Sequence, residues 1–238
     1  MPTVVYTAIF GEYDDLHQPS PQDEPCVFIC FTDGDMPCQV GAWHIIHVPP
    51  LPGVHPRLQA KWFKLRSHEV FIGGQLAARF APQSLYQGAD LTIWIDGNRR
   101  IKGSTFVKDM RRNLGDGDWA MFVHPDRDCI YEEAETCAGL VKCKDMPVLE
   151  QANAYRSVVP SHSGLFACTV IVRREPSTAH LIPVYEMWWE EILTRSIRDQ
   201  ISLPFVLRHH DETCQPVLIR EHLRINEWFE TVPHNSNL

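Results

Sequence analysis

The stretch of sequence that decides the fold is residues 91–98, Leu-Thr-Ile-Trp-Ile-Asp-Gly-Asn. Its first five residues are apolar or β-branched, which predicts a buried strand that ends before Asp96. Asp-Gly-Asn is a common hairpin turn. The same three residues place two side-chain oxygens one glycine apart, where both can reach one hard cation such as Mg²⁺ or Mn²⁺. The stretch therefore predicts a sheet strand with either a turn or a metal site at its carboxyl end.

Apolar runs on both sides of this stretch predict further strands, at residues 4–10, 26–31, 43–48, 119–123 and 165–172. Helical patterns occupy residues 56–65, 105–114, 127–142, 147–158 and 179–197. Strands that alternate with helices indicate an α/β sheet. Because no Gly/Ser-rich linker divides the chain, we predict a single domain over residues 1–238.

Charge is distributed unevenly along the chain. The net charge is −8, and residues 1–56 contain no Lys or Arg, whereas residues 57–112 contain eleven of them against four acidic residues. Such a chain lacks the wide positive face that duplex binding needs, which argues against a nucleic-acid acceptor. It suits a localised anion site, for example for a nucleotide diphosphate. Arg57, Lys61 and Lys64 share one face of a predicted helix and can grip a pyrophosphate, although a solvated basic face gives the same pattern.

Several common functional signatures are absent from the sequence. It contains no G-x-G-x-x-G after a strand, no Walker A motif and no G-x-S-x-G, so dinucleotide oxidoreductases, P-loop enzymes and nucleophile-elbow hydrolases have no support. No apolar run approaches the roughly 20 residues that span a bilayer, and the first strand lacks the basic flank of a signal peptide. The eight cysteines form no CxxC pair, so we expect reduced thiols and a cytoplasmic protein.

Two sets of residues are weak candidates for structural zinc, because neither has paired close spacing. They are His209 and His210 with Cys214, and Cys129 with Cys137 and Cys143.

Arg198-Asp199-Gln200 is a further polar cluster, which we place near the end of the tryptophan-rich helix. Asp199 there is a candidate general base toward an acceptor hydroxyl, or a group that holds an acceptor sugar. A helix-end salt bridge with Arg195 or Arg198 explains the pattern equally well. For Glu132 and Glu133, we favour a solvated helix face.

Taken in order, several segments form one pattern along about residues 4–208: Tyr6-Thr7-Ala8-Ile9-Phe10-Gly11-x-Tyr13-Asp14, Cys30-Phe31-Thr32-Asp33, Arg57…Lys61-Trp62-Phe63-Lys64, Trp94-Ile95-Asp96-Gly97-Asn98, His124-Pro125-x-Arg127-x-Cys129-Ile130-Tyr131-x-Glu133-Ala134, Val170-Ile171-Val172-Arg173 and Arg198-Asp199-Gln200-Ile201-Ser202. Each motif is unspecific alone. The ordered set resembles a glycosyltransferase-like family of bacteria and plants, long catalogued as a domain of unknown function, whose plant members are linked to cell-wall and mucilage polysaccharide.

The resemblance implies a GT-A-like (Rossmann-like) fold, with a central, mostly parallel sheet flanked by helices. Its recognisable core is about 4–208, followed by a C-terminal extension at 209–238. Enzymes of this fold commonly use Asp-x-Asp to bind Mn²⁺ or Mg²⁺ against the donor's diphosphate. Asp96 matches the first acid, while Asn98 stands at the last position and offers a neutral oxygen. A late histidine would be the third ligand, for which His209, His210 and His222 are candidates.

The same resemblance implies a set of donor-binding residues: Thr7, Ala8, Phe10, Tyr13, Asp33, Arg57, Lys61, Lys64 and Asp96. Asp199 would be the catalytic base of an inverting enzyme. We therefore predict a metal-assisted glycosyltransferase that moves a sugar from a nucleotide-sugar donor, a UDP-sugar, to a glycan acceptor in polysaccharide biosynthesis. A non-catalytic GT-A-like binding or scaffold protein, supported by Asn98, and a hydrolase of sugar- or lipid-phosphate substrates are the alternatives.

Overall fold

An eight-stranded sheet organises the part of the chain that the computed structural model describes, which is residues 3–71, 89–175 and 177–235. Its strands lie in the order β3 (Gln39–Val40), β4 (Trp43–His47), β2 (Cys26–Thr32), β1 (Thr3–Ile9), β5 (Leu91–Ile95), β8 (Phe166–Arg174), β7 (Trp119–Val123) and β9 (Val217–Ile219). A separate pair of short strands is formed by β6 (Arg99–Ile101) and β10 (Phe229–Thr231).

Most strands of the large sheet run in parallel. β1 pairs with β2 on one side and with β5 on the other, so that Thr3 lies opposite both Cys26 and Leu91. β8 is antiparallel to both of its neighbours, β5 and β7, and β9 is parallel to β7. The carboxyl ends of β1, β5 and β7 therefore meet at one edge of the sheet, the edge at which α/β proteins form their ligand clefts.

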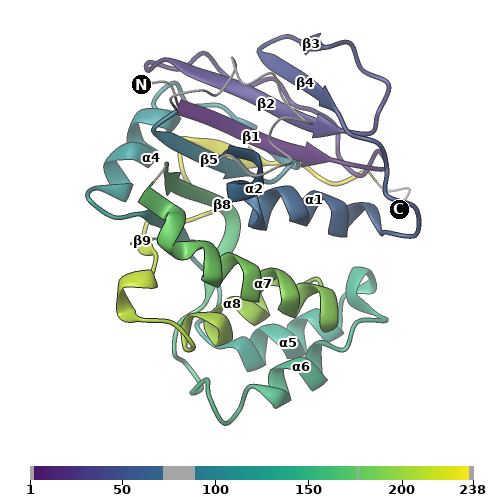
Figure 1. Cartoon of the computed structure of the whole chain (residues 1–238), viewed down its shortest axis with the longest axis vertical. Helices are drawn as coiled ribbons and strands as arrows, with labels where there is room; N and C mark the ends of the chain where they lie inside the picture. Colours follow the sequence, from purple (N-terminus) through teal and green to yellow (C-terminus); the bar gives the residue numbers. More distant parts are fainter. Residues whose placement is uncertain (1–2, 72–88, 176, 236–238) are drawn as a thin grey trace.

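Helices cover both faces of the sheet (Figure 1). Side chains alternate between the two faces of β1 because successive residues of a strand point in opposite directions. Val4, Tyr6 and Ala8 pack in the cluster with α1 (Pro56–Leu65), α2 (Ser67–Phe71), α7 (Ile182–Thr194) and α8 (Asp199–Leu207). Val5 and Ile9 pack on the opposite side, with α4 (Phe106–Leu114).

A third, smaller core lies beyond α7 and α8, at the lower end of Figure 1. It joins α5 (Ile130–Ala138) and α6 (Val148–Ala154), and Ile201 of α8 packs into it. Short 3₁₀ turns occupy Val141–Cys143, Ser177–Leu181 and Glu212–Cys214.

The predicted fold class, an α/β domain with a central, mostly parallel sheet flanked by helices, is confirmed. The helices expected at 127–142 and 179–197 are shorter than predicted, at Ile130–Ala138 and Ile182–Thr194. The placement of Asp199 near the end of the tryptophan-rich helix was wrong. The chain leaves α7 at Arg195, buries Ser196 against Gln151, and starts α8 at Asp199.

The segment after residue 208, predicted as a C-terminal extension, forms part of both sheets. It contributes β9 to the large sheet and β10 to the small one. Its last described residues return to the loop after β1, where the Asn235 N–H donates to the Tyr13 carbonyl at 3.3 Å. Among the described helices, none is long and apolar enough to cross a lipid bilayer.

Candidate functional site

A cleft of about 340 Å³ opens at the edge where the parallel strands end. Its walls come from the end of β1, the turn between β5 and β6, the face of α1, the first half of β8 and the start of α8. Antiparallel β8 reaches this edge with its amino-terminal half, because the Asp96 N–H donates to the Thr169 carbonyl at 3.0 Å. Segments far apart in sequence thus meet around one hollow.

A cluster of four charged side chains, two of them buried, lines the cleft. Lys61 Nζ and Lys64 Nζ each lie 2.7 Å from the same oxygen of Asp199, Oδ2. Lys64 Nζ also donates to Asp96 Oδ1 at 3.1 Å. The side chains of Lys64 and Asp199 are only 4% and 6% exposed, so these ion pairs are removed from water and little screened.

Burial and pairing shift the pKa values of this cluster. Burial alone would raise the pKa of Asp199, but the two lysine ammonium groups outweigh it and hold that pKa well below its ordinary value. Burial lowers the pKa of Lys61 to about 8, against the opposing attraction of Asp199. For Lys64, burial acts downward, yet Asp199 and Asp96 together raise its pKa above the ordinary value. Near neutral pH the cluster therefore holds two ammonium groups around Asp199 and Asp96.

Asp96 is oriented by its own strand. The Trp94 indole Nε1–H donates to Asp96 Oδ1 at 2.8 Å, and the Asp96 side chain remains 34% exposed toward the cleft. The following Gly97 is required by close packing. A Cβ at this position would lie 2.9 Å from Asp14 Oδ2, closer than real Cβ atoms approach, and 3.0 Å from Ile9 Cγ1, which is tighter than most real contacts. The Asp-Gly-Asn turn is thus pressed against the loop after β1.

A histidine from the end of the described chain completes this corner. His234 Nδ1 lies 2.6 Å from Asp14 Oδ1, and His234 Nε2 lies 3.4 Å from Asn98 Nδ2. A carboxylate that accepts a hydrogen bond from Nδ1–H fixes the ring with its Nε2 lone pair toward Asn98, which is the tautomer that metal-binding histidines usually have. Asp96, Asn98 and His234 offer carboxylate, amide and imidazole donors that fit a divalent cation.

The family model described as TOD1/MUCI70, glycosyltransferase-like domain, matches residues 1–234. The chain belongs to this family. No curated protein matches the chain. Family membership, together with the cleft at the carboxyl ends of the parallel strands, gives the protein a glycosyltransferase-like function and confirms the resemblance inferred from the sequence.

In this glycosyltransferase-like protein, most of the predicted site residues line the one cleft: Ala8, Phe10, Tyr13, Arg57, Lys61, Lys64, Asp96, Asn98 and Asp199. Two do not. Thr7 is 1% exposed within β1. Asp33 Oδ1 instead accepts a hydrogen bond from the Gly11 N–H at 2.9 Å, which fixes the loop after β1. Arg57 lies over the Tyr13 ring, with its guanidinium carbon 5.7 Å from the ring centroid.

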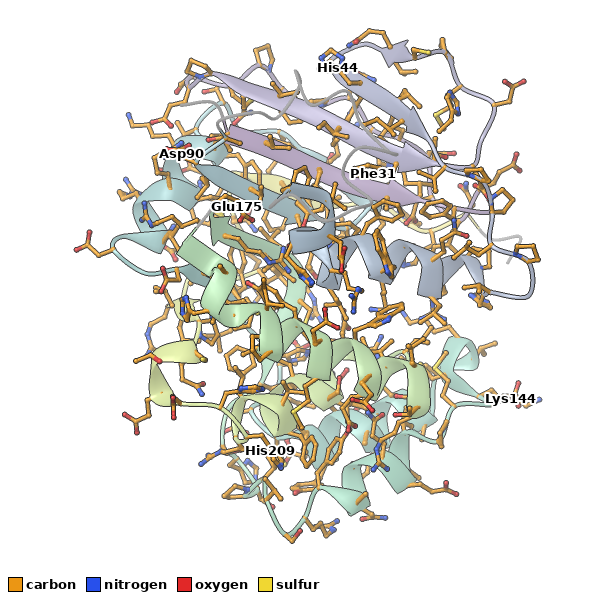
Figure 2. The ribbon with its side chains drawn as sticks, in the orientation of Figure 1. Phe31, His44, Asp90, Lys144, Glu175 and His209 are labelled. Atoms are coloured by element: carbon orange, nitrogen blue, oxygen red, sulfur yellow. The ribbon has the colours of Figure 1, made fainter. Side chains whose placement is uncertain are left out.

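The three histidines predicted as possible third ligands lie outside this cleft lining. His209 Nδ1 contacts the Phe205 carbonyl at 2.9 Å, and Figure 2 shows it among the lower helices, away from the sheet. His222 is exposed and accepts a hydrogen bond from the Arg224 backbone. His234 lies in the cleft lining instead, beside Asn98, and its only signal in the sequence was that it is a histidine late in the chain.

The structure also reveals a second charged cluster in the cleft wall, which the sequence did not indicate. Glu133 is 2% exposed and pairs with Arg127 at 2.6 Å and Arg198 at 2.8 Å. The expectation of a solvated face was therefore wrong for Glu133, although Glu132 is exposed. The alternative of a helix-end salt bridge between Asp199 and Arg195 or Arg198 does not hold, because Arg198 pairs with Glu133 and Arg195 with Glu191.

In neither predicted zinc set do the ligand atoms lie close enough together to share one ion. Within the described ranges, the groups of three or more His, Cys, Asp or Glu side chains whose ligand atoms are close enough to share an ion are His68 with Glu69 and Glu186, and Asp128 with Glu132 and His162. Three buried cysteines that had been considered as zinc ligands pack instead into the apolar core of α5 and α6: Cys129, Cys137 and Cys143.

Proposed function

We propose that this protein transfers a sugar from a UDP-sugar to a glycan acceptor, assisted by Mn²⁺ or Mg²⁺. The observation that carries the proposal is the charge of the cleft. Among the residues that the structure describes, eight Lys or Arg side chains line it against four Asp or Glu. This excess of positive charge suits a diphosphate, and it lies at the edge of the sheet where nucleotides bind in folds of this kind.

The base and ribose of the donor would occupy the end of β1. Ala8, Phe10 and Tyr13 line the cleft there, and a Tyr13 ring beside an Arg57 guanidinium offers a surface on which a planar base can stack. The diphosphate would then lie toward α1, within reach of Arg57 and the lysine cluster.

Asp96, Asn98 and His234 would hold the divalent cation, with Asp14 orienting the imidazole. When bound, such a cation neutralises the negative charge that grows on the leaving diphosphate as the glycosidic bond breaks. The chain contributes fixed positive charge to the same end through Lys61 and Lys64, whose positions are set by Asp199 and Asp96.

Asp199 is the proposed base toward the acceptor hydroxyl. In the arrangement described, its depressed pKa makes it a weak base, because both lysines stabilise the carboxylate. A diphosphate that draws Lys61 and Lys64 toward itself would remove part of that stabilisation and raise the pKa of Asp199. Donor binding would in this way prepare the base for the acceptor.

The proposal is tested by measuring both donor binding and sugar transfer. Wild-type protein should be stabilised thermally by UDP or a UDP-sugar with Mn²⁺, and a ligand at 100 times its Kd should add about 2.7 kcal/mol. Asp96→Ala should lose this stabilisation, whereas Asp116→Ala, an exposed acid away from the cleft lining, should retain it. Asp199→Asn should bind donor but lose transfer.

Three other outcomes would each contradict a part of the proposal. No stabilisation by any nucleotide would refute the donor assignment. Binding without transfer to any glycan, by an otherwise folded protein, would favour a non-catalytic binding protein. Full transfer by Asp199→Asn would remove Asp199 as the base.

A further inference from the structure

Arg99 is a cation of the cleft that none of the roles above uses. It is the first residue of β6, directly after the Asp-Gly-Asn turn, and its side chain lines the cleft. Its Nε and Nη1 atoms are buried, and neither has a hydrogen-bond partner among the described residues. Burial lowers the pKa of Arg99, while Asp96 and Asp14 act in the opposite direction.

Three other arginines of the cleft lining have carboxylate partners, while Arg57 donates to the Lys142 carbonyl and lies over the Tyr13 ring. Arg127 and Arg198 pair with Glu133, and Arg224 pairs with Asp126. Within the described ranges, no carboxylate lies within ion-pair distance of Arg99. A buried polar group without a partner is costly, and a native protein keeps one where a ligand supplies the missing acceptors. A guanidinium whose Nε–H and Nη1–H groups are buried and lack an acid partner matches phosphate oxygens well.

The neighbouring turn indicates which charge Arg99 balances. A second acid at position 98 would add a negative ligand for a divalent cation, but Asn98 supplies only a neutral amide. Metal affinity rises with the number of charged ligands, so this site holds its cation less tightly than one with two acids. A fixed guanidinium beside the turn provides positive charge that does not depend on metal occupancy.

We propose that Arg99 binds the diphosphate of the donor directly and sustains donor binding when the divalent cation is absent. The inference rests on the proposed function for the identity of the nucleotide, but not for the anion itself. Arg99 and the cation would share the charge of the leaving group, so that removal of either one makes the protein more dependent on the other.

Arg100 is a matched control for Arg99. It is the next residue of the same strand, points to the other side, and pairs with Glu230 of β10, with its side chain 55% exposed. Arg100→Gln removes the same charge and the same group as Arg99→Gln without touching the cleft lining. Arg99→Lys retains the charge but loses the planar array of donors.

The experiment measures Kd by calorimetry for two probes, UDP and inorganic pyrophosphate, each with Mn²⁺ and with EDTA. In wild type we expect UDP and pyrophosphate to bind in EDTA. Arg99→Gln should raise both Kd values by about 10- to 100-fold, or about 1.4 to 2.8 kcal/mol, with the larger change in EDTA. Arg99→Lys should recover part of the loss, and Arg100→Gln should match wild type. Melting temperatures within a few degrees of wild type verify that the variants are folded.

Three results separate this inference from the proposed function. Equal Kd values for Arg99→Gln and wild type overturn the role of Arg99 and leave the proposed function standing. Arg99-dependent binding of pyrophosphate without any binding of UDP supports the anion site and removes the nucleotide assignment. Failure of wild type to bind either probe overturns both.

Discussion

Removal of the Asp199 carboxylate tests the buried lysine cluster most directly. Asp199→Ala leaves Lys61 and Lys64 as two ammonium groups around an empty position, with side chains only 16% and 4% exposed. Loss of one partner from a buried ion pair costs about 3–5 kcal/mol. We therefore expect the free energy of unfolding to fall by about that amount at pH 6. Urea unfolding monitored by tryptophan fluorescence, with the m-value unchanged, measures the difference.

The deficit should depend on pH in a defined direction. In wild type the pKa of Lys61 is already lowered to about 8, with Asp199 opposing the effect of burial. Without Asp199 it falls further, so folded Asp199→Ala loses this proton at a pH where the unfolded chain still holds it. The unfolded state then binds more protons, and the stability of the variant rises with pH. Between pH 6 and 8 the deficit should shrink by up to about 1.4 kcal/mol per pH unit.

A surface ion pair serves as the control. Asp126→Ala breaks the contact with Arg224, in which the arginine side chain is 57% exposed, and an exposed pair of this kind contributes about 0–1 kcal/mol. If Asp199→Ala costs no more than Asp126→Ala and its cost does not change from pH 6 to 8, the cluster is not the coupled, buried unit described here.

Three further predictions concern the corner around the Asp-Gly-Asn turn and the cleft wall. His234→Gln should abolish the increase in UDP affinity that the metal gives. Asp14→Asn, which changes only the partner of the imidazole, should weaken Mn²⁺ affinity by about 10- to 100-fold. Titration of Mn²⁺ against UDP-bound protein measures both effects, and unchanged affinity rejects the site. Gly97→Ala places a Cβ against Asp14 and should lower stability by about 1–3 kcal/mol in urea unfolding; a neutral result would show that the turn is not tightly packed. Glu133→Ala leaves the Arg198 guanidinium without its acid partner and should lower the free energy of unfolding by about 3–5 kcal/mol. The control, Glu132→Ala at the exposed neighbouring position, should lower it by under 1 kcal/mol in the same measurement.

Local pattern was enough to predict two of the elements that carry the site, β5 and α1. The run from Leu91 to Ile95 predicted β5 with its observed bounds, because five buried residues in extended conformation need an uninterrupted apolar sequence. Pro56 and the basic residues after it predicted α1, which the structure places at Pro56–Leu65. These signals are local, since strand and helix periodicity are properties of neighbouring residues.

The residues that contact the predicted site residues lie far from them in the sequence. Asn98 and His234 are 136 positions apart, and no periodic pattern connects a residue in a turn to one in a terminal loop. Glu133 resembles Glu132 in sequence, yet only Glu133 faces Arg127 and Arg198. The break between α7 and α8 also escaped prediction, because it depends on the burial of Ser196 against Gln151 of another helix.

The sequence by itself determined the α/β class, the family and the edge of the sheet where the cleft lies, because these follow from hydrophobic patterning and from motifs that keep their order along the chain. The tertiary structure alone decided which charges are paired and which are left for a ligand. Lys61 and Lys64 converge on Asp199 from another helix, while Arg99 has two buried guanidinium nitrogens and no acid partner among the described residues. Pairing depends on distances of a few ångströms between segments that meet only when the chain is folded, and a linear sequence does not encode those distances explicitly.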